Sequence, residues 1–252
     1  MLANNHVLDW GYAGLDETIG TLRAAGLRAV GAGANALEAA APAVIDLGER
    51  GRILVFGCGS ATSGIPPDWH ARTTQPGVNL LPDLSVATAR SVATAMATYR
   101  RPQDVVVASV HWGSNWGYTI PAEQRDFARA LIDSGVDIVH GHSSHHAKGI
   151  EVYRQRLVLY GCGDFLNDYE GIGGYETFRG DLSLMYFVDV DAAGGIVTLH
   201  MVPLRMRRFS LQPASRGDAQ WLTAMLERES VLEHGIELAG DHSLTLRVVT
   251  CC

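Results

Sequence analysis

The order of secondary-structure signals along the 252 residues predicts an α/β fold. Short apolar runs alternate with segments of helical periodicity in the first half of the chain, and β-hairpin signals follow in the second half. A hydrophobic fraction of 47% supplies enough apolar surface for a large core. Helix–strand units followed by hairpins favour two mixed sheets packed together, with helices outside them.

The first half of the chain predicts helices and buried strands in alternation. Apolar residues at helical spacing predict a helix around 15–27, and Gly26 suits its C-terminal end. A second helix is expected over 36–47, where Pro42 must fall in the first turns or break it. The remaining elements of this half are an apolar strand at 52–56 running into a glycine loop, a long loop at 60–84, a helix at 85–100 and a strand at 104–110.

The long stretch 60–84 holds four prolines together with glycines and threonines. Loops of this length in compact domains are often lids or binding loops, and a plain surface connection is the equally weighted alternative.

The second half predicts one more helix–strand unit and then hairpins. Pro121 near a first turn and Gly135 at its end predict a helix over 121–134. The elements that follow are a strand at 136–139, a hairpin of 149–153 with 156–160, a longer hairpin of 182–190 with 196–204, a helix at 215–228 and a strand at 244–249.

Charge and composition narrow the class of partner. The net charge is −7 at pH 7 and no basic stripe is visible, so a nucleic-acid partner is not expected. The basic cluster Arg205, Arg207 and Arg208 alternates with apolar residues, which indicates the solvent face of a strand. Cys58 and Cys162 follow apolar runs beside glycines, which favours reduced thiols near strand ends.

No apolar run approaches the ~20 residues of a membrane span, and no signal sequence is visible. The expectation is a cytoplasmic protein. The start of the chain qualifies that expectation, because residues 1–3 run straight into a polar cluster as though a strand were cut midway. An upstream segment carrying a signal or an anchor stays open.

Histidines are concentrated after the predicted strand 136–139, where His140, His142, His145 and His146 fall within seven residues. The carboxyl ends of strands are where open α/β sheets place ligand sites. Imidazole is a common metal ligand, and the intervening glycine and serines permit a tight turn. His142 and His145 flank a short loop and are expected to converge, while His140 is expected on the opposite side or behind them. The alternative is that these histidines are only surface or core residues.

Three further segments carry polar groups that suit the same chemistry. His111 directly follows the strand 104–110, so two strands deliver histidines to one sheet edge. Asn5 offers an amide oxygen to a hard metal, and His6 with Asp9 makes a histidine whose tautomer a carboxylate fixes. Asp164, in a glycine-rich strand end, is expected to support a ligand histidine or to bind substrate. Each of these is a turn or a structural feature on the plainer interpretation.

Four motifs in this order resemble the poly-γ-glutamate capsule-biosynthesis (CapA-type) family, which belongs with the calcineurin-like metallophosphatases. They are Asn4-Asn5-His6-x-x-Asp9, His111-Trp112-Gly113, Gly141-His142-x-x-His145 with Gly149-Ile150-Glu151, and Tyr160-Gly161-x-Gly163-Asp164-Phe165. The resemblance implies a four-layer α/β/β/α sandwich with a metal centre at the sheet edge. It also implies that residues 1–252 form one such domain, lacking N-terminal strands of the family.

The resemblance implies a role for each matching residue. Asn5, His111, His142 and His145 would bind one or more divalent ions, of manganese, iron or zinc. His6 would be the catalytic acid or base, with Asp9 beside it. The residues expected to support these ligands or contact substrate are Asn4, Trp112, Asn115, His140, His146 and Asp164.

Departures from the family pattern point to a distinct subfamily. The family pattern begins upstream with Gly-Asp and Asn-x-Glu segments that supply acidic ligands, and this chain starts after both. Asn115 stands where the family often has an acid, and Asp164 stands where it usually has Asn.

The leading hypothesis is a metal-dependent hydrolase acting on a small-molecule or peptide substrate, whose activity depends on those acidic ligands. The alternatives are a peptide epimerase that uses the same site and a non-catalytic remnant or capsule-assembly partner.

Overall fold

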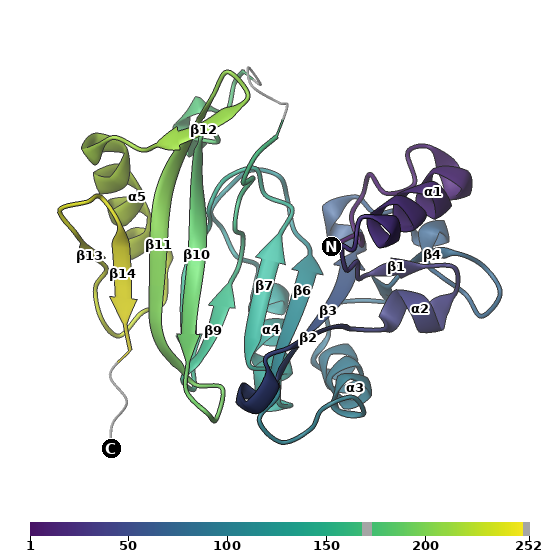
Figure 1. The fold of residues 1–252 in the computed structure, drawn as a ribbon. Coiled ribbons are helices and arrows are strands. Elements are labelled where there is room, and N and C mark those ends of the chain that lie inside the picture. Colours follow the sequence, from purple (N-terminus) through teal and green to yellow (C-terminus); the bar gives the residue numbers. More distant parts are fainter. Residues whose placement is uncertain (168–172, 249–252) are drawn as a thin grey trace. The chain divides into compact units, whose positions relative to one another are not determined.

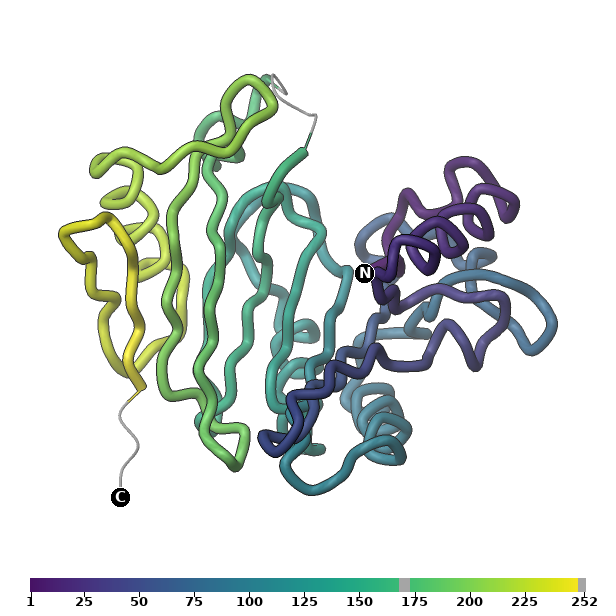
Figure 2. Tube along the Cα trace, viewed as in Figure 1, coloured from purple at the N-terminus to yellow at the C-terminus, as the bar shows by residue number. Residues whose placement is uncertain are grey.

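The computed structural model describes residues 1–167 and 173–248, and its secondary structure is mixed α/β, as the sequence predicts. Two compact units divide the chain. Unit 1 comprises Met1–Ser114 and Pro121–Ser143, and unit 2 comprises Asn115–Ile120 and Ser144–Cys252. Figure 1 labels the elements of both units, and Figure 2 follows the path of the chain through them. That one domain spans residues 1–252 stays a prediction.

Unit 1 is built on a mixed sheet with a parallel centre. β6 (Val105–His111) pairs in parallel with β3 (Arg52–Ser60) on one side and with β7 (Ile138–His142) on the other. β2 (Ala43–Asp46) runs antiparallel to β3, and the short β5 (Leu80–Leu81) pairs with the end of β3. Apolar side chains such as Leu54, Val106 and Val139 are almost fully buried, as expected for strands covered on both faces.

Two amphipathic helices of unit 1 accompany this sheet. α3 (Val86–Ala97) begins at Ser85, whose hydroxyl accepts a hydrogen bond from the Thr88 amide, and it buries small residues and Met96. α4 (Ala122–Asp133) begins after Pro121 and packs against α3 and β7. Gly135 ends it with φ +100°, a conformation that favours glycine. Both helices were predicted within a few residues of their observed bounds.

The predicted helix over 36–47 is wrong beyond its first turns. α2 covers only Ala36–Ala40, and β2 begins at Ala43. Pro42 lacks an amide hydrogen and restricts the residue before it to extended backbone, and the observed ψ of Ala41 is 143°. The proline therefore converts the second half of an apolar segment into a strand.

The rest of unit 1 surrounds the N-terminal segment. Its elements are α1 (Gly11–Ala24), β1 (Ala32–Gly33) paired with β4 (Gly77–Val78), and 3-10 turns at Gly48–Arg50, Ala61–Ser63 and Pro67–Trp69. The stretch 60–84 contributes Ile65, Val78 and Leu80 to a buried cluster around Ala3. Much of this long connection is therefore core packing for the N-terminal segment.

Unit 2 contains two hairpins. β8 (Ile150–Tyr153) and β9 (Arg156–Leu159) are joined by Arg154 and Gln155, which both have positive φ as a tight hairpin turn requires. β10 (Leu182–Val190) and β11 (Ile196–Arg207) pair along their length, and the elements that complete the unit are β12 (Ser210–Pro213), β13 (Glu237–Leu238), β14 (Leu244–Arg247), α5 (Arg216–Glu229) and a 3-10 turn at Glu176–Phe178. Residue 249 of the predicted last strand lies outside the described residues.

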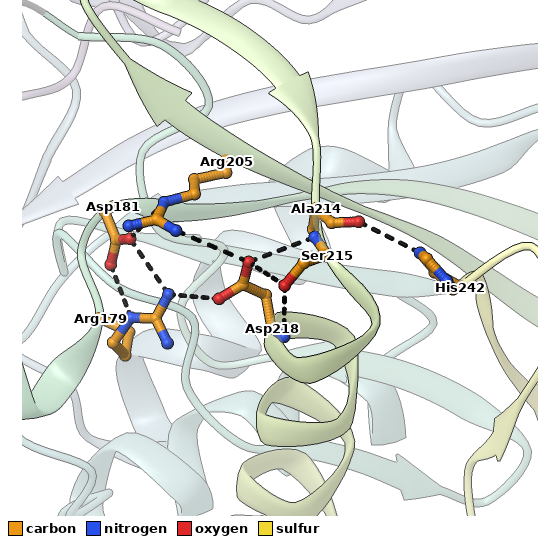
Figure 3. A network of polar contacts seen from close by, with 7 residues as sticks. All are labelled: Arg179, Asp181, Arg205, Ala214, Ser215, Asp218 and His242. Atoms are coloured by element: carbon orange, nitrogen blue, oxygen red, sulfur yellow. Dashed lines mark hydrogen bonds and ion pairs between the residues drawn. The ribbon is translucent and has the colours of Figure 1, made fainter.

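An ion-pair network fixes the start of α5 within unit 2 (Figure 3). Asp218 accepts from the Ser215 amide and hydroxyl, while its own amide donates to that hydroxyl, which forms a reciprocal helix cap. Arg179 donates to Asp218 at 2.6 Å and to Asp181 at 2.8 Å, and Arg205 also pairs with Asp181. Arg205 and Arg207 are exposed on either side of buried Met206, as the alternating pattern predicts.

None of the helices in the described part of the chain combines the length and the apolar character that crossing a membrane requires.

Candidate metal centre

The register of two parallel strands gathers four polar side chains of unit 1. β6 and β7 are aligned so that Ser109 lies opposite His140 and His111 lies opposite His142. Side chains two residues apart on a strand share a face, so all four lie on one face of the sheet. β7 extends to His142, which corrects the prediction that the strand ends at Val139. His140 and His142 are therefore on the same side. Of the two placements predicted for His140, the one on the opposite side is wrong, and the one behind His142 agrees with their link through Ser109.

Glycines on the neighbouring strand let the N-terminal segment lie over this face. Gly57 and Gly59 of β3 stand opposite Ser109 and His111. A Cβ at Gly59 would stand 2.9 Å from the carbonyl oxygen of Ala3 and would clash with Ile65. The missing side chains therefore leave the space through which the segment after Ala3 brings Asn5 to His111.

A continuous series of hydrogen bonds links these residues, and we refer to Asn5, His111, His142, Ser109 and His140 as the histidine chain. Asn5 Oδ1 lies 3.2 Å from His111 Nε2, and the two Nδ1 atoms of His111 and His142 are 2.9 Å apart. His142 Nε2 lies 3.3 Å from Ser109 Oγ, which in turn lies 3.0 Å from His140 Nδ1.

Burial favours the neutral form of two imidazoles in the histidine chain, those of His142 and His140. It lowers the pKa of His142 well below the ordinary 6.5, and the nearby His111 and His140 rings and the N-terminal amino group add to that effect. Burial likewise lowers the pKa of His140. A metal ligand must be a neutral imidazole with a free lone pair, so the environment favours the ligand form of His142 near pH 7.

The spacing of the donor atoms fits a small cation. Two nitrogens bound to one tetrahedral zinc ion stand about 3.4 Å apart. The His111–His142 nitrogen pair at 2.9 Å therefore needs to open by only about 0.5 Å. Within residues 1–167 and 173–248, no three His, Cys, Asp or Glu side chains form a group that could hold a metal ion. The amide oxygen of Asn5 faces Nε2 of His111, the ring nitrogen that does not meet His142, so as the side chains stand it is not a third donor to an ion held by that nitrogen pair.

His6 and Asp9 form an exposed pair beside the histidine chain in sequence. His6 Nδ1 lies 2.8 Å from Asp9 Oδ2, and both side chains are at least half exposed. The Asn4 side chain accepts a hydrogen bond from the His6 amide, which makes Asn4 a turn residue. The carboxylate fixes one ring nitrogen of His6 and leaves Nε2 to exchange a proton.

His145 lies in unit 2, where a carboxylate holds its ring. Its Nδ1 is 2.8 Å from Asp164 Oδ2, and Asn167 also donates to that carboxylate. The hydrogen bond to Asp164 raises the pKa of His145, against the lowering effect of burial. The main-chain oxygen of exposed Asn115 accepts from the His145 amide. That His145 shares an ion with His111 and His142 stays a prediction.

Two of the predicted supporting residues are packed inside their units. Trp112 is 1% exposed and meets Phe127 edge to face, so it serves the core of unit 1. His146 is fully buried in unit 2, donates through Nδ1 to the Ala147 carbonyl and stacks on Phe178. Burial lowers the pKa of His146 to about 4.

Two residues near the site were missed from the sequence. Ser109 joins His140 to His142, and its position two residues before His111 was the available signal, because that spacing places both on one strand face. Trp116 of unit 2 packs against His145 with ring centroids 5.5 Å apart and stacks on Tyr175 at 4.4 Å. An aromatic residue in a glycine-rich loop after a strand was the signal for Trp116.

Comparison with known proteins identifies one family and several relatives, whose names refer to capsule or polyglutamine synthesis. The family described as "Bacterial capsule synthesis protein PGA_cap" matches residues 1–169. The "Probable polyglutamine synthesis accessory protein" of Mycobacterium tuberculosis is 47% identical over 231 residues, which is 91% of this chain and 61% of the relative. The "Capsule biosynthesis protein CapA" of Bacillus anthracis is 28% identical over 216 residues, covering 85% of this chain and 49% of the relative. The chain thus spans about half to three fifths of the length of these relatives.

Proposed function

Because the chain belongs to the bacterial capsule synthesis (PGA_cap) family, we propose that it is a metal-dependent hydrolase of capsule or polyglutamate metabolism, with a metallophosphatase-like four-layer sandwich as its fold. The observation that carries the proposal is the approach of His111 Nδ1 to His142 Nδ1 at 2.9 Å, with Asn5 Oδ1 3.2 Å from the other ring nitrogen of His111. The names of the relatives, which refer to capsule and polyglutamine synthesis, support the substrate class.

The donor set favours particular ions. Asn5, His111, His142 and His145 are the proposed ligands of one or more divalent cations. Imidazole with amide oxygen suits manganese, iron or zinc better than calcium. Such an ion supplies a Lewis acid and an activated water for hydrolysis.

The remaining residues have roles that their contacts support. His6 gives or takes a proton at Nε2, because Asp9 engages Nδ1 and fixes the tautomer. Asp164 orients His145 through the same kind of contact and leaves the other ring nitrogen available to a ligand.

The proposal is tested with the purified chain and a γ-glutamyl oligopeptide, and with a phosphomonoester as the second substrate. We expect turnover of one of them that is lost after chelation and restored by Mn²⁺, Fe²⁺ or Zn²⁺. Turnover that survives chelation, or absence of turnover with every metal, contradicts the hydrolase. Exchange of a Cα hydrogen for deuterium without cleavage would assign the epimerase instead.

A second candidate is a non-catalytic accessory role, which the name of the Mycobacterium tuberculosis relative favours. An accessory protein would bind the polymer or a partner without turning it over. Binding of γ-glutamyl oligopeptide with equal affinity before and after chelation, without cleavage, would support that role.

A further inference from the structure

Unit 1 contains a pocket of about 540 Å³ that shares no residue with the histidine chain. Its lining comes from one stretch of sequence, Ile19 to Val44, which includes parts of α1, β1, α2 and the start of β2 (Figure 1). Sites for small molecules commonly have volumes of about 300–1,000 Å³ and combine apolar walls with a few polar groups. The pocket therefore has the size of a ligand site.

The end of α1 brings two arginines to this pocket. Arg23 lies in the last turn of the helix, and Arg28 follows the turn that ends it. Gly26 has φ +72°, and the Leu27 amide donates to the Leu22 carbonyl at 2.9 Å, which is the pattern of a Schellman helix ending. The chain changes direction at this glycine, so two side chains five positions apart line the same pocket.

The charged side chains described in the lining are two exposed arginines and one glutamate. Within the part of the chain that the structure describes, neither Arg23 nor Arg28 forms an ion pair or a side-chain hydrogen bond. Glu38 Oε2 accepts a hydrogen bond from the Ala34 amide at 3.2 Å, so the main chain engages this carboxylate. The pocket thus carries an excess of positive charge, although the net charge of the chain is −7.

The other residues described in the lining are apolar. Ile19, Leu27, Pro42 and Val44 contribute aliphatic surface, and Leu27 is 59% exposed. A ligand that covered these side chains would remove apolar surface from water, which favours binding. The lining therefore suits a ligand that carries acidic groups on a short aliphatic framework.

We propose that this pocket binds a γ-linked glutamate chain, with carboxylates on Arg23 and Arg28 and methylene groups against the aliphatic surface. A guanidinium group presents its donors in a planar fork that matches a carboxylate. A γ-glutamyl chain carries one free carboxylate on each residue and methylene groups between successive carboxylates, so it offers both features of the lining. This inference rests on the proposed function for the identity of the polymer, and it gives that polymer a contact outside the histidine chain.

Binding of γ-linked triglutamate to the full chain is measured by calorimetry in the presence of a chelator, so that metal plays no part. R23Q and R28Q each remove one positive charge. R90Q is the matched control, because Arg90 is exposed on α3 of the same unit and is not among the lining residues. The amide NMR signals of Ala32 and Val44 report whether the pocket itself is occupied, and inorganic phosphate is the alternative anion.

We expect R23Q and R28Q each to weaken triglutamate binding about 10-fold, because each removes charge-assisted hydrogen bonds, and R90Q to bind like the wild type. The signals of Ala32 and Val44 should shift on binding. Wild-type affinity in the double variant R23Q/R28Q, or shifts that spare both signals, overturns the inference, and tighter binding of phosphate overturns the carboxylate assignment. A wild-type chain that binds no triglutamate overturns the pocket alone if metal-dependent turnover is observed, and the absence of turnover contradicts the hydrolase separately.

Discussion

The two units prepare their histidines in opposite ways. In unit 1, His142 shares hydrogen bonds with the neutral side chain of Ser109 and with the His111 ring, and burial lowers the pKa of His142. In unit 2, His145 has a carboxylate partner at 2.8 Å, and that partner raises its pKa. The same residue type is thus held neutral in one unit and favoured as a cation in the other.

This difference in pKa determines in which protonation state each histidine would bind a metal ion. The lowered pKa keeps His142 neutral near pH 7. A cation that binds this ring must therefore displace a hydrogen bond but rarely a proton. His145 must give up a proton near neutral pH, although the Asp164 contact also fixes its ring and strengthens it as a donor. Affinity in unit 2 should therefore depend more steeply on pH.

The largest expected effect is the loss of metal on removing one of these rings. H142A or H145A should each abolish most of the bound metal, because each deletes a proposed ligand. Metal content of the chelated and reloaded proteins is measured by elemental analysis. The matched control is H200A, since the His200 ring makes a hydrogen bond to Thr245 in unit 2. His234 and His242 should also tolerate alanine. Unchanged metal content in both H142A and H145A would sink the ligand assignment.

The next effect sharpens the role of the carboxylate in unit 2. D164N should lower the pKa of His145, because the amide no longer stabilises the charged ring, and should weaken metal binding about 10–100-fold. The ring pKa is followed by proton NMR through the His145 signal, with the His142 signal as the internal comparison. A His145 pKa unmoved by D164N would show that the ion pair does not form in solution.

A smaller effect concerns the pH dependence of folding in the metal-free chain. Between pH 6.5 and the lower pKa of folded His142, the unfolded chain binds a proton that the folded chain does not, so acid should reduce stability there. His145 acts oppositely: its contribution is full below pH 6.5 and is lost as pH rises through its raised pKa.

Urea midpoints from pH 5 to pH 8 test this contrast. H142N should reduce the change of the urea midpoint with pH on the acid side of this range. H145Q should reduce that change near neutral pH. If the urea midpoints of the two variants depend on pH in the same way, the proposed difference between His142 and His145 is wrong.

The smallest effect is on thiol reactivity. Burial raises the pKa of both Cys58 in unit 1 and Cys162 in unit 2 to about 12, so little thiolate is present at pH 8. Cys58 is buried and Cys162 is partly accessible, so iodoacetamide should modify Cys162 first and both far more slowly than in urea. Peptide mass mapping separates them from Cys251 and Cys252, which lie outside the described residues. Faster modification of Cys58 would reverse the expected order.

The sequence by itself determined most elements and the polar residues at strand ends. The apolar runs at β6, the hairpin turn at Arg154 and Gln155, and the helix cap at Ser215 depend on neighbours only a few residues away. Such local signals are legible in one sequence. The same reading failed over 36–47, where an apolar pattern fits a helix and a strand equally and the proline decided between them.

Tertiary structure alone decided which of those polar residues meet. The register of β6 against β7 places His140 beside Ser109 and on the face of His142, and the glycines of β3 admit the segment that carries Asn5. It also buried Trp112 beside Phe127. Strand register and the packing of one segment over another join residues up to 106 positions apart. Side-chain periodicity within a strand carries no information about such distant neighbours, which is why the sequence supplied the donors but not their order in the histidine chain.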